Sequence, residues 1–190
     1  MDTHCGSLIT RFRKNTRGVA AVEFALILPF LIILLIGVAE TTTGLNQDRK
    51  VSQVASSIGD IVARATSVSS SNLADIMEAR KYIMEPYDWT KMTVIVASVS
   101  FDKNKKATVD WSADQTGGSA GGWNPGGKPP ISIPAGAIAA EKSIIICQTK
   151  YTYVPMFASL AQNIFPRATS IDMSGIVFLR PRLTTKVTKT

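Results

Sequence analysis

The residues whose types could support catalysis are few in this chain. His4 is the only histidine, and it lies on the N-terminal side of a long apolar run, as does Cys5, whereas Cys147 lies far beyond that run. The residues after the run therefore have no histidine for a Ser/His/Asp triad, a Cys/His pair or a His-based metal site. We predict that the protein is not an enzyme and uses no cofactor or metal.

The carboxylates after the apolar run are also poor candidates for chemistry. Glu85 and Asp88 lie in the sequence EPYDW, which is typical of a turn. The segment 102–106 starts like a calcium loop, but its three lysines and the missing distal glutamate favour a hairpin turn. We expect turns at both places, not paired-carboxylate or calcium sites.

One carboxylate, Glu23, stands inside the apolar run 19–39. At about 1.5 Å per residue this run spans roughly 30 Å, enough to cross a bilayer. Four basic residues precede the run between positions 11 and 17, and Glu40 closes it. The positive-inside rule then predicts a cytoplasmic N-terminus and residues 41–190 on the outer side.

A carboxylate in a membrane segment has a high free-energy cost, and two interpretations account for Glu23. One interpretation is that Glu23 reaches the lipid headgroups or pairs with Arg17. The other starts from Gly18, because a glycine followed at the fifth position by glutamate and then by the aromatic Phe24 forms a constellation at the head of an apolar helix.

This constellation resembles a prepilin processing site. In the type IV pilin families a membrane peptidase cuts after the glycine, and the glutamate pairs with the freed amine of a neighbouring subunit. The resemblance implies that Gly18 precedes the cut, that Val19 is the new terminus, and that Glu23 and Phe24 take part in subunit pairing. An ammonium and a carboxylate attract strongly in low dielectric, whereas an unpaired charge is penalised there.

The stretch RGVAAVEFALILPF, residues 17–30, resembles the TadE/TadG group of pilin-like assembly proteins from tight-adherence (Flp, type IVc) pili. Flp-type motifs usually carry tyrosine after the glutamate, and Phe24 keeps the ring without the hydroxyl. The resemblance implies a minor pilin, pseudopilin or assembly factor that acts in pilus biogenesis, adhesion and surface attachment. Its implied partners are other pilin-like subunits, the assembly platform and the prepilin peptidase at the bacterial inner membrane, with the C-terminal domain in the periplasm.

Two alternatives remain open at the level of sequence. A bitopic cell-envelope protein with a partner-binding periplasmic domain would keep its leader and never enter a pilus. A secreted soluble domain would be cut after Ala39, where Gly37, Val38 and Ala39 are small enough to end a signal peptide.

The composition limits the domain organisation. We predict a cytoplasmic leader at 1–18, a transmembrane helix at 19–39, an amphipathic helix extension at 40–66 and an extracytoplasmic head at 67–190. Much of the net charge of +7 belongs to the leader. The remaining basic residues are scattered and form no nucleic-acid-binding stripe.

The extension carries an apolar stripe at helical spacing, made of Val51, Val54, Ala55, Ile58, Val62 and Ala65. This stripe fits a helix that packs on its own domain or, alternatively, faces a filament. The polar stretch 40–47 could loosen or break the helix before it, because Gly44 and three threonines are weak helix formers. Within the membrane segment, Pro29 is expected to kink the helix.

The head is predicted to be α+β and pilin-like, with a mainly antiparallel sheet of about four strands and short helices. One expected helix is capped by Ser71 or Asn72 and runs to about Met84, and a second covers 154–165. Expected strands cover 91–101, 107–112, 143–154 and 168–179. The basic tail 180–190 is expected to fray.

The loop 115–134 holds six glycines and four prolines around Trp123, and it is expected to lack regular structure. Trp123 either tacks the loop to the sheet or anchors a partner-binding surface. Cys147 fits a small buried hydrophobic residue better than a reactive or bridging thiol. It cannot pair with Cys5 across a membrane.

Overall fold

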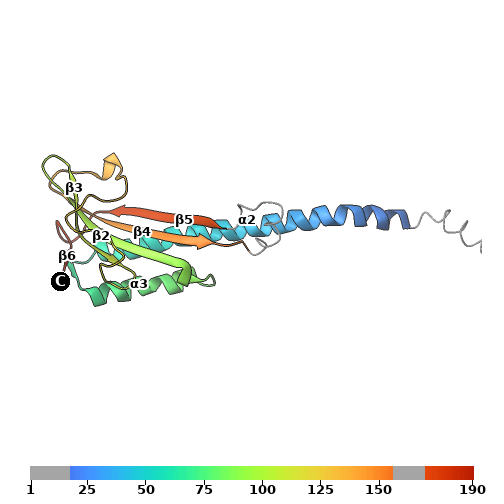
Figure 1. The fold of residues 1–190 in the computed structure, drawn as a ribbon, viewed down its shortest axis with the longest axis horizontal. Coiled ribbons are helices and arrows are strands. Elements are labelled where there is room, and N and C mark those ends of the chain that lie inside the picture. The colour runs from blue at the N-terminus through green and yellow to red at the C-terminus, as the bar shows by residue number, and fades with distance from the viewer. Residues whose placement is uncertain (1–17, 156–169) are drawn as a thin grey trace, which may run out of the picture. The chain divides into compact units, whose positions relative to one another are not determined.

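The computed structural model describes residues 18–155 and 170–190. The chain divides into two compact units, residues 1–42 and residues 43–190. A long apolar helix comes first, and a mainly antiparallel sheet with short helices follows (Figure 1). This order confirms the α+β class.

Helix α2, Val19–Ala63, contains both the apolar run and the amphipathic stripe. The helix continues through the polar stretch 40–47. The weak helix formers in this stretch had given a physical reason to expect a loosened or broken helix there. The hydroxyls of Thr41 and Thr42 donate to the carbonyls of Gly37 and Val38, at 2.8 and 2.9 Å. These bonds use the i−4 positions of a regular helix, so the threonines remain compatible with it. Pro29 also lies within α2.

The apolar stripe of α2 packs on its own domain, which was one of the two interpretations of the sequence. Val51, Val54, Ala55, Ile58 and Val62 are fully buried in the main core. The backbone of α2 comes very close to the sheet, because a Cβ at Gly175 would lie 3.1 Å from the Cα of Ser52. The Thr149 hydroxyl also donates to the Val51 carbonyl at 3.1 Å.

The sheet has the order β3-β2-β4-β5 and is antiparallel throughout. Its strands are β2, Met92–Phe101; β3, Ala107–Asp114; β4, Ser143–Tyr153; and β5, Ile171–Leu179. All four were predicted to within a few residues. The predicted helix at 154–165 lies almost wholly outside the described residues.

Strand β4 is buried on both faces. Ile145 and Cys147 belong to the main core beneath α2, whereas Ile144 and Ile146 belong to a second core on the opposite face. The unbroken apolar run at 144–147 reflects this double burial, since strict alternation is expected only where one face meets water.

Helix α3, Ser70–Met84, lies beside the head part of α2 (Figure 1), and Lys50 of α2 donates to the Ile83 carbonyl at 2.7 Å. Its N-cap is Ser69, whose hydroxyl accepts from the Asn72 amide. The prediction of Ser71 or Asn72 as the cap was therefore wrong by two or three positions. Three consecutive serines at 69–71 offer equivalent capping oxygens, so sequence alone does not separate them.

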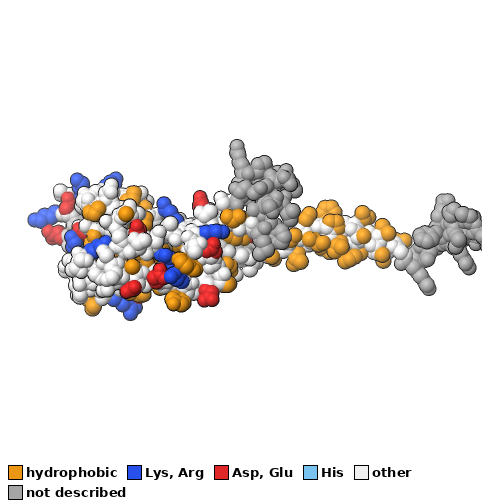
Figure 2. All heavy atoms as spheres, turned by 60° about the horizontal axis from the view of Figure 1, so that its bottom comes forward, with side chains coloured by type: hydrophobic (Ala, Val, Ile, Leu, Met, Phe, Trp, Pro, Cys, Tyr) orange, Lys and Arg blue, Asp and Glu red, His pale blue; other side chains and the backbone are white. Residues whose placement is uncertain are grey.

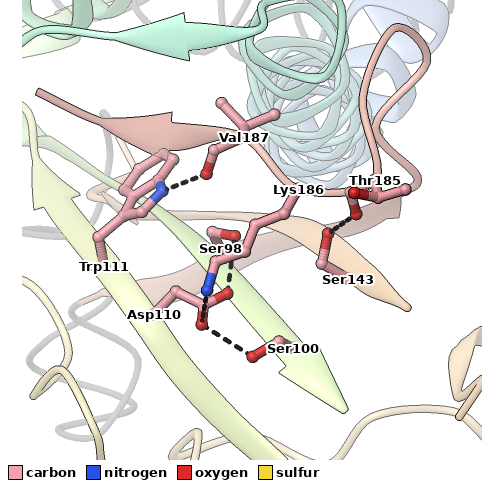
Figure 3. A network of polar contacts seen from close by, with 8 residues as sticks. All are labelled: Ser98, Ser100, Asp110, Trp111, Ser143, Thr185, Lys186 and Val187. Carbon is pink, nitrogen blue, oxygen red and sulfur yellow. Dashed lines mark hydrogen bonds and ion pairs between the residues drawn. The ribbon is translucent and has the colours of Figure 1, made fainter. Parts of the chain in front are cut away.

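The expectation that the basic tail frays is wrong. The indole of Trp111 donates to the Val187 carbonyl at 2.8 Å, and the side chain of Val187 is fully buried (Figure 3). Lys186 pairs with Asp110 at 2.5 Å, and the Ser143 hydroxyl donates to the Thr185 carbonyl at 2.6 Å. The tail ends as strand β6, Thr188–Lys189, which pairs in parallel with β1, Ser67–Val68.

The loop 115–134 contains no helix or strand, as predicted. Trp123 is buried in the second core, and its amide donates to the Ser112 hydroxyl at 2.9 Å. Trp123 thus fastens the loop to the sheet. Gly117 is required here, because its φ of +77° is unfavourable for other residues and a Cβ would lie 1.9 Å from the Ser70 carbonyl oxygen.

Asp114 organises the start of this loop. Its carboxylate accepts from the amide and hydroxyl of Thr116, at 2.9 and 2.6 Å, and from the Gly121 amide at 3.0 Å. Burial acts to raise the pKa of this carboxyl, but the three hydrogen bonds prevail and hold the pKa below its ordinary value.

We expect Asp114→Asn to destabilise the head by about 1 to 3 kcal/mol, because an amide cannot accept all three bonds. A lowered pKa in the folded state means that the ionised carboxylate stabilises the fold above pH 3.8 and that this contribution is lost as the pH falls through the folded pKa. The difference in urea stability between wild type and variant should therefore shrink in acid. Asp172→Asn is the control, since that exposed carboxylate accepts one bond, from Thr152, and should change stability by less than about 0.5 kcal/mol.

Candidate functional site

The candidate site lies at the N-terminal end of α2. Large apolar side chains cover this part of the helix and stay exposed, with Phe24, Phe30 and Leu35 at 58%, 73% and 68% (Figure 2). Within the described residues, α2 is the one helix long and apolar enough to span a membrane, and none of its apolar window is buried within the chain. A surface of this kind needs lipid or other helices around it.

Gly18 directly precedes the helix, and Val19 is its first residue. The peptide bond expected to be cut therefore joins the last residue before α2 to the helix itself. A Cβ built on Gly18 would meet no atom within 4 Å, so the packing of the described residues does not demand glycine here. The reason for a glycine at position 18 therefore lies outside the packing of the folded chain.

Glu23 follows Val19 by four residues, so their side chains lie on one face of the helix, about 6 Å apart along its axis. The carboxylate is exposed, and it makes no hydrogen bond or ion pair with any residue that the structure describes. The alternative partner Arg17 lies outside the described residues. In a bilayer, Glu23 would need water, a headgroup or a cation from another molecule.

The comparisons with known proteins bear on this same segment. Residues 18–59 match the family model of TadE-like proteins. The match begins at Gly18, includes Glu23 and Phe24, and ends in the buried stripe of α2 at Gly59. It confirms the resemblance inferred from the motif. No curated protein and no solved structure matches the chain.

Three further predictions concern residues outside α2. Asp88 caps the short helix η2, Trp89–Lys91, and Glu85 ends α3, so both lie at turns as expected. Asp102 closes the β2–β3 hairpin by accepting from the amides of Asn104 and Lys106, at 2.8 and 2.7 Å. Across the described residues, no three His, Cys, Asp or Glu side chains are grouped to hold a metal ion.

Cys147 is fully buried in the main core, as predicted, and is not in a disulfide. Burial raises the pKa of its thiol to about 12, despite an opposing backbone hydrogen bond at Gly59. A thiol with this pKa is almost entirely protonated at neutral pH and is a poor nucleophile. Cys5 lies outside the described residues.

Sequence reasoning missed one charged residue of the head, Arg80. It is 7% exposed and sits over the Trp89 ring, 5.3 Å from the centroid. Its position seven residues after Leu73 on α3 places it on the buried face, which was the available signal. Charged residues are seldom buried, so this spacing alone does not single out Arg80.

Proposed function

We propose that this protein is a minor pilin or pilin-like assembly factor of a tight-adherence pilus, acting in pilus biogenesis and surface attachment. The observation that carries the proposal is the TadE-like match over residues 18–59, which includes the glycine, the glutamate and the aromatic residue of the motif. The exposed apolar surface of α2 supports the proposal, because such a surface suits a bilayer and a bundle of similar helices equally well.

In this proposal each motif residue has a role. A prepilin peptidase cuts between Gly18 and Val19, and the new amine of Val19 pairs with Glu23 of a neighbouring pilin-like subunit. Phe24 packs beside this pair and limits its contact with water. The N-terminus lies in the cytoplasm, α2 crosses the inner membrane, and the head lies in the periplasm, where it meets the assembly platform and other subunits.

Removal and restoration of the protein in its source bacterium would test this function. We expect cells that lack the chain to lose most pili and most surface attachment, and cells supplied with the wild-type chain to recover both. Pili are counted by electron microscopy, and attached cells are counted on an abiotic surface. The abundance of the other pilus proteins is the control for indirect effects.

Unchanged piliation and attachment in cells that lack the chain would contradict the proposal. That result would favour a bitopic envelope protein whose periplasmic head serves another partner. If piliation does depend on the chain, shearing pili from the restored cells distinguishes the two proposed roles. A filament subunit leaves with the sheared fraction, and an assembly factor stays with the membrane.

A further inference from the structure

A groove of about 760 Å³ lies where the β2–β3 hairpin meets the end of the glycine- and proline-rich loop. Its volume falls in the range of about 300 to 1,000 Å³ that is typical of ligand sites. The lining has two parts of different chemistry. Branched aliphatic residues and prolines, including Ile131, Ile133 and Ile138, form the apolar floor. The rest of the lining includes three lysines, Lys105, Lys106 and Lys128.

The floor of the groove is part of the folded head. Ile131, Ile133 and Ile138 are half-buried and pack against the second core, the same cluster that holds Trp123. The floor is therefore preformed, and its outer half remains open to a ligand. Preformed apolar floors of this kind favour ligands with apolar groups of their own.

The three lysines are not neutralised within the part of the chain that the structure describes. None of them makes an ion pair there, and the described lining includes no aspartate or glutamate. Other lysines of the head do pair with carboxylates, as Lys186 does with Asp110. Three uncompensated positive charges around an apolar floor favour an anionic ligand.

The hairpin holds two of these lysines in place. Lys105 has a φ of 61°, a left-handed conformation in which glycine or asparagine is usual. Asp102 fixes the turn, since its carbonyl accepts from the Lys105 amide and its own amide donates to the Lys106 carbonyl, at 2.9 and 3.1 Å. These backbone bonds fix the points from which the Lys105 and Lys106 side chains leave the hairpin.

The backbone of the floor favours a peptide over other anions. Ile131 and Ile133 are half-buried, whereas Ser132 between them is exposed. Their amides donate no hydrogen bond to any described residue. The carbonyl groups of a bound peptide could accept from these amides while its alternate side chains rest on the apolar floor.

We propose that this groove binds an extended segment of a partner protein in which carboxylates alternate with apolar side chains. The apolar side chains rest on the isoleucine floor, the carboxylates face the three lysines, and backbone hydrogen bonds form with residues 131–133. This site is independent of the membrane segment and of the role proposed for Glu23.

The test uses the full chain in nanodiscs of zwitterionic lipid and a fluorescent synthetic peptide of alternating glutamate and leucine. We expect saturable binding, measured by anisotropy, that weakens as salt rises from about 50 to about 300 mM. The double variant Lys105→Gln/Lys128→Gln should weaken binding at least about fivefold, because two charge pairs are lost. Lys103→Gln is the matched control, since Lys103 lies in the same hairpin but outside the groove, and it should change binding less than about twofold.

Two comparison ligands complete the experiment. A peptide with serine in place of leucine should bind at least about fivefold more weakly, since it keeps the charge and loses the apolar contacts. Polyglucuronate, an acidic polysaccharide, should compete poorly. The proposal is overturned if the double variant binds like wild type, if the serine peptide binds equally well, or if the polysaccharide binds through the same lysines and the peptide does not.

Discussion

Replacing Gly18 by valine is expected to leave the protein at full length, whereas the wild type is expected to lose its leader to a prepilin peptidase. A β-branched side chain would crowd a peptidase site that is shaped for glycine. The fold itself should not change, because a Cβ at Gly18 meets no atom within 4 Å. Co-expression of each form with the peptidase, followed by gel electrophoresis, measures the fraction processed.

Gly37→Val is a matched control for this experiment. Gly37 lies in the same helix, and a Cβ there also meets no atom within 4 Å. The control should be processed like the wild type. If wild type, Gly18→Val and Gly37→Val all remain unprocessed, cleavage is excluded while the membrane topology is unaffected.

Replacing Glu23 by alanine is expected to abolish co-purification with other pilin-like subunits and to remove most pili. If Glu23 pairs with the Val19 amine of a neighbour, the substitution leaves that ammonium without its partner in low dielectric. Broken buried pairs in soluble proteins cost about 3 to 5 kcal/mol, which corresponds to at least about a hundredfold weaker association. Membrane insertion and leader cleavage should persist, because a polar group has been removed from an apolar helix.

Glu40→Ala provides the control for the same change of charge at the other end of the apolar run. It should leave co-purification and piliation at wild-type levels. The measurements are a pull-down from solubilised membranes and a pilus count. Normal values of both in Glu23→Ala would show that the carboxylate only reaches the headgroups, and the pairing role would be rejected.

Local patterns in the sequence predicted most of the fold. The stripe from Val51 to Val62 repeats at helical spacing, and the run at 144–147 marks a strand buried on both sides. These signals are local because each element must bury one or both of its faces whatever its neighbours are. The hairpin at Asp102 was equally accessible, since turn chemistry is decided within a few residues.

The error at the C-terminal tail arose because distant residues decide its structure. The tail is held by an indole 76 positions earlier in the chain, and no local pattern connects Trp111 with Val187. The buried guanidinium of Arg80 depends similarly on the Trp89 ring, which lies beyond the end of α3. Polar composition alone therefore wrongly suggested a frayed tail, and it gave no sign that Arg80 is buried.

At the candidate site, the sequence predicted the residues of the motif but a single chain does not reveal their roles. The motif of Gly18, Glu23 and Phe24 could be read from residue types and spacing, and the TadE-like match covers the same residues. The proposed roles of these residues, however, involve a peptidase and a second subunit. A single chain contributes only the exposure of Glu23 and the open space at Gly18, so those roles require experiments with the partners present.

The N-terminus of the protein recovered from membranes tests the central claim most directly. N-terminal sequencing and intact mass spectrometry of the protein, isolated from cells that contain the prepilin peptidase, would identify it. The pilin account predicts Val19 as the first residue. A protein that starts at Met1 would contradict cleavage and indicate an uncut anchor, and one that starts at Glu40 would contradict the membrane-anchored account altogether and indicate a secreted domain.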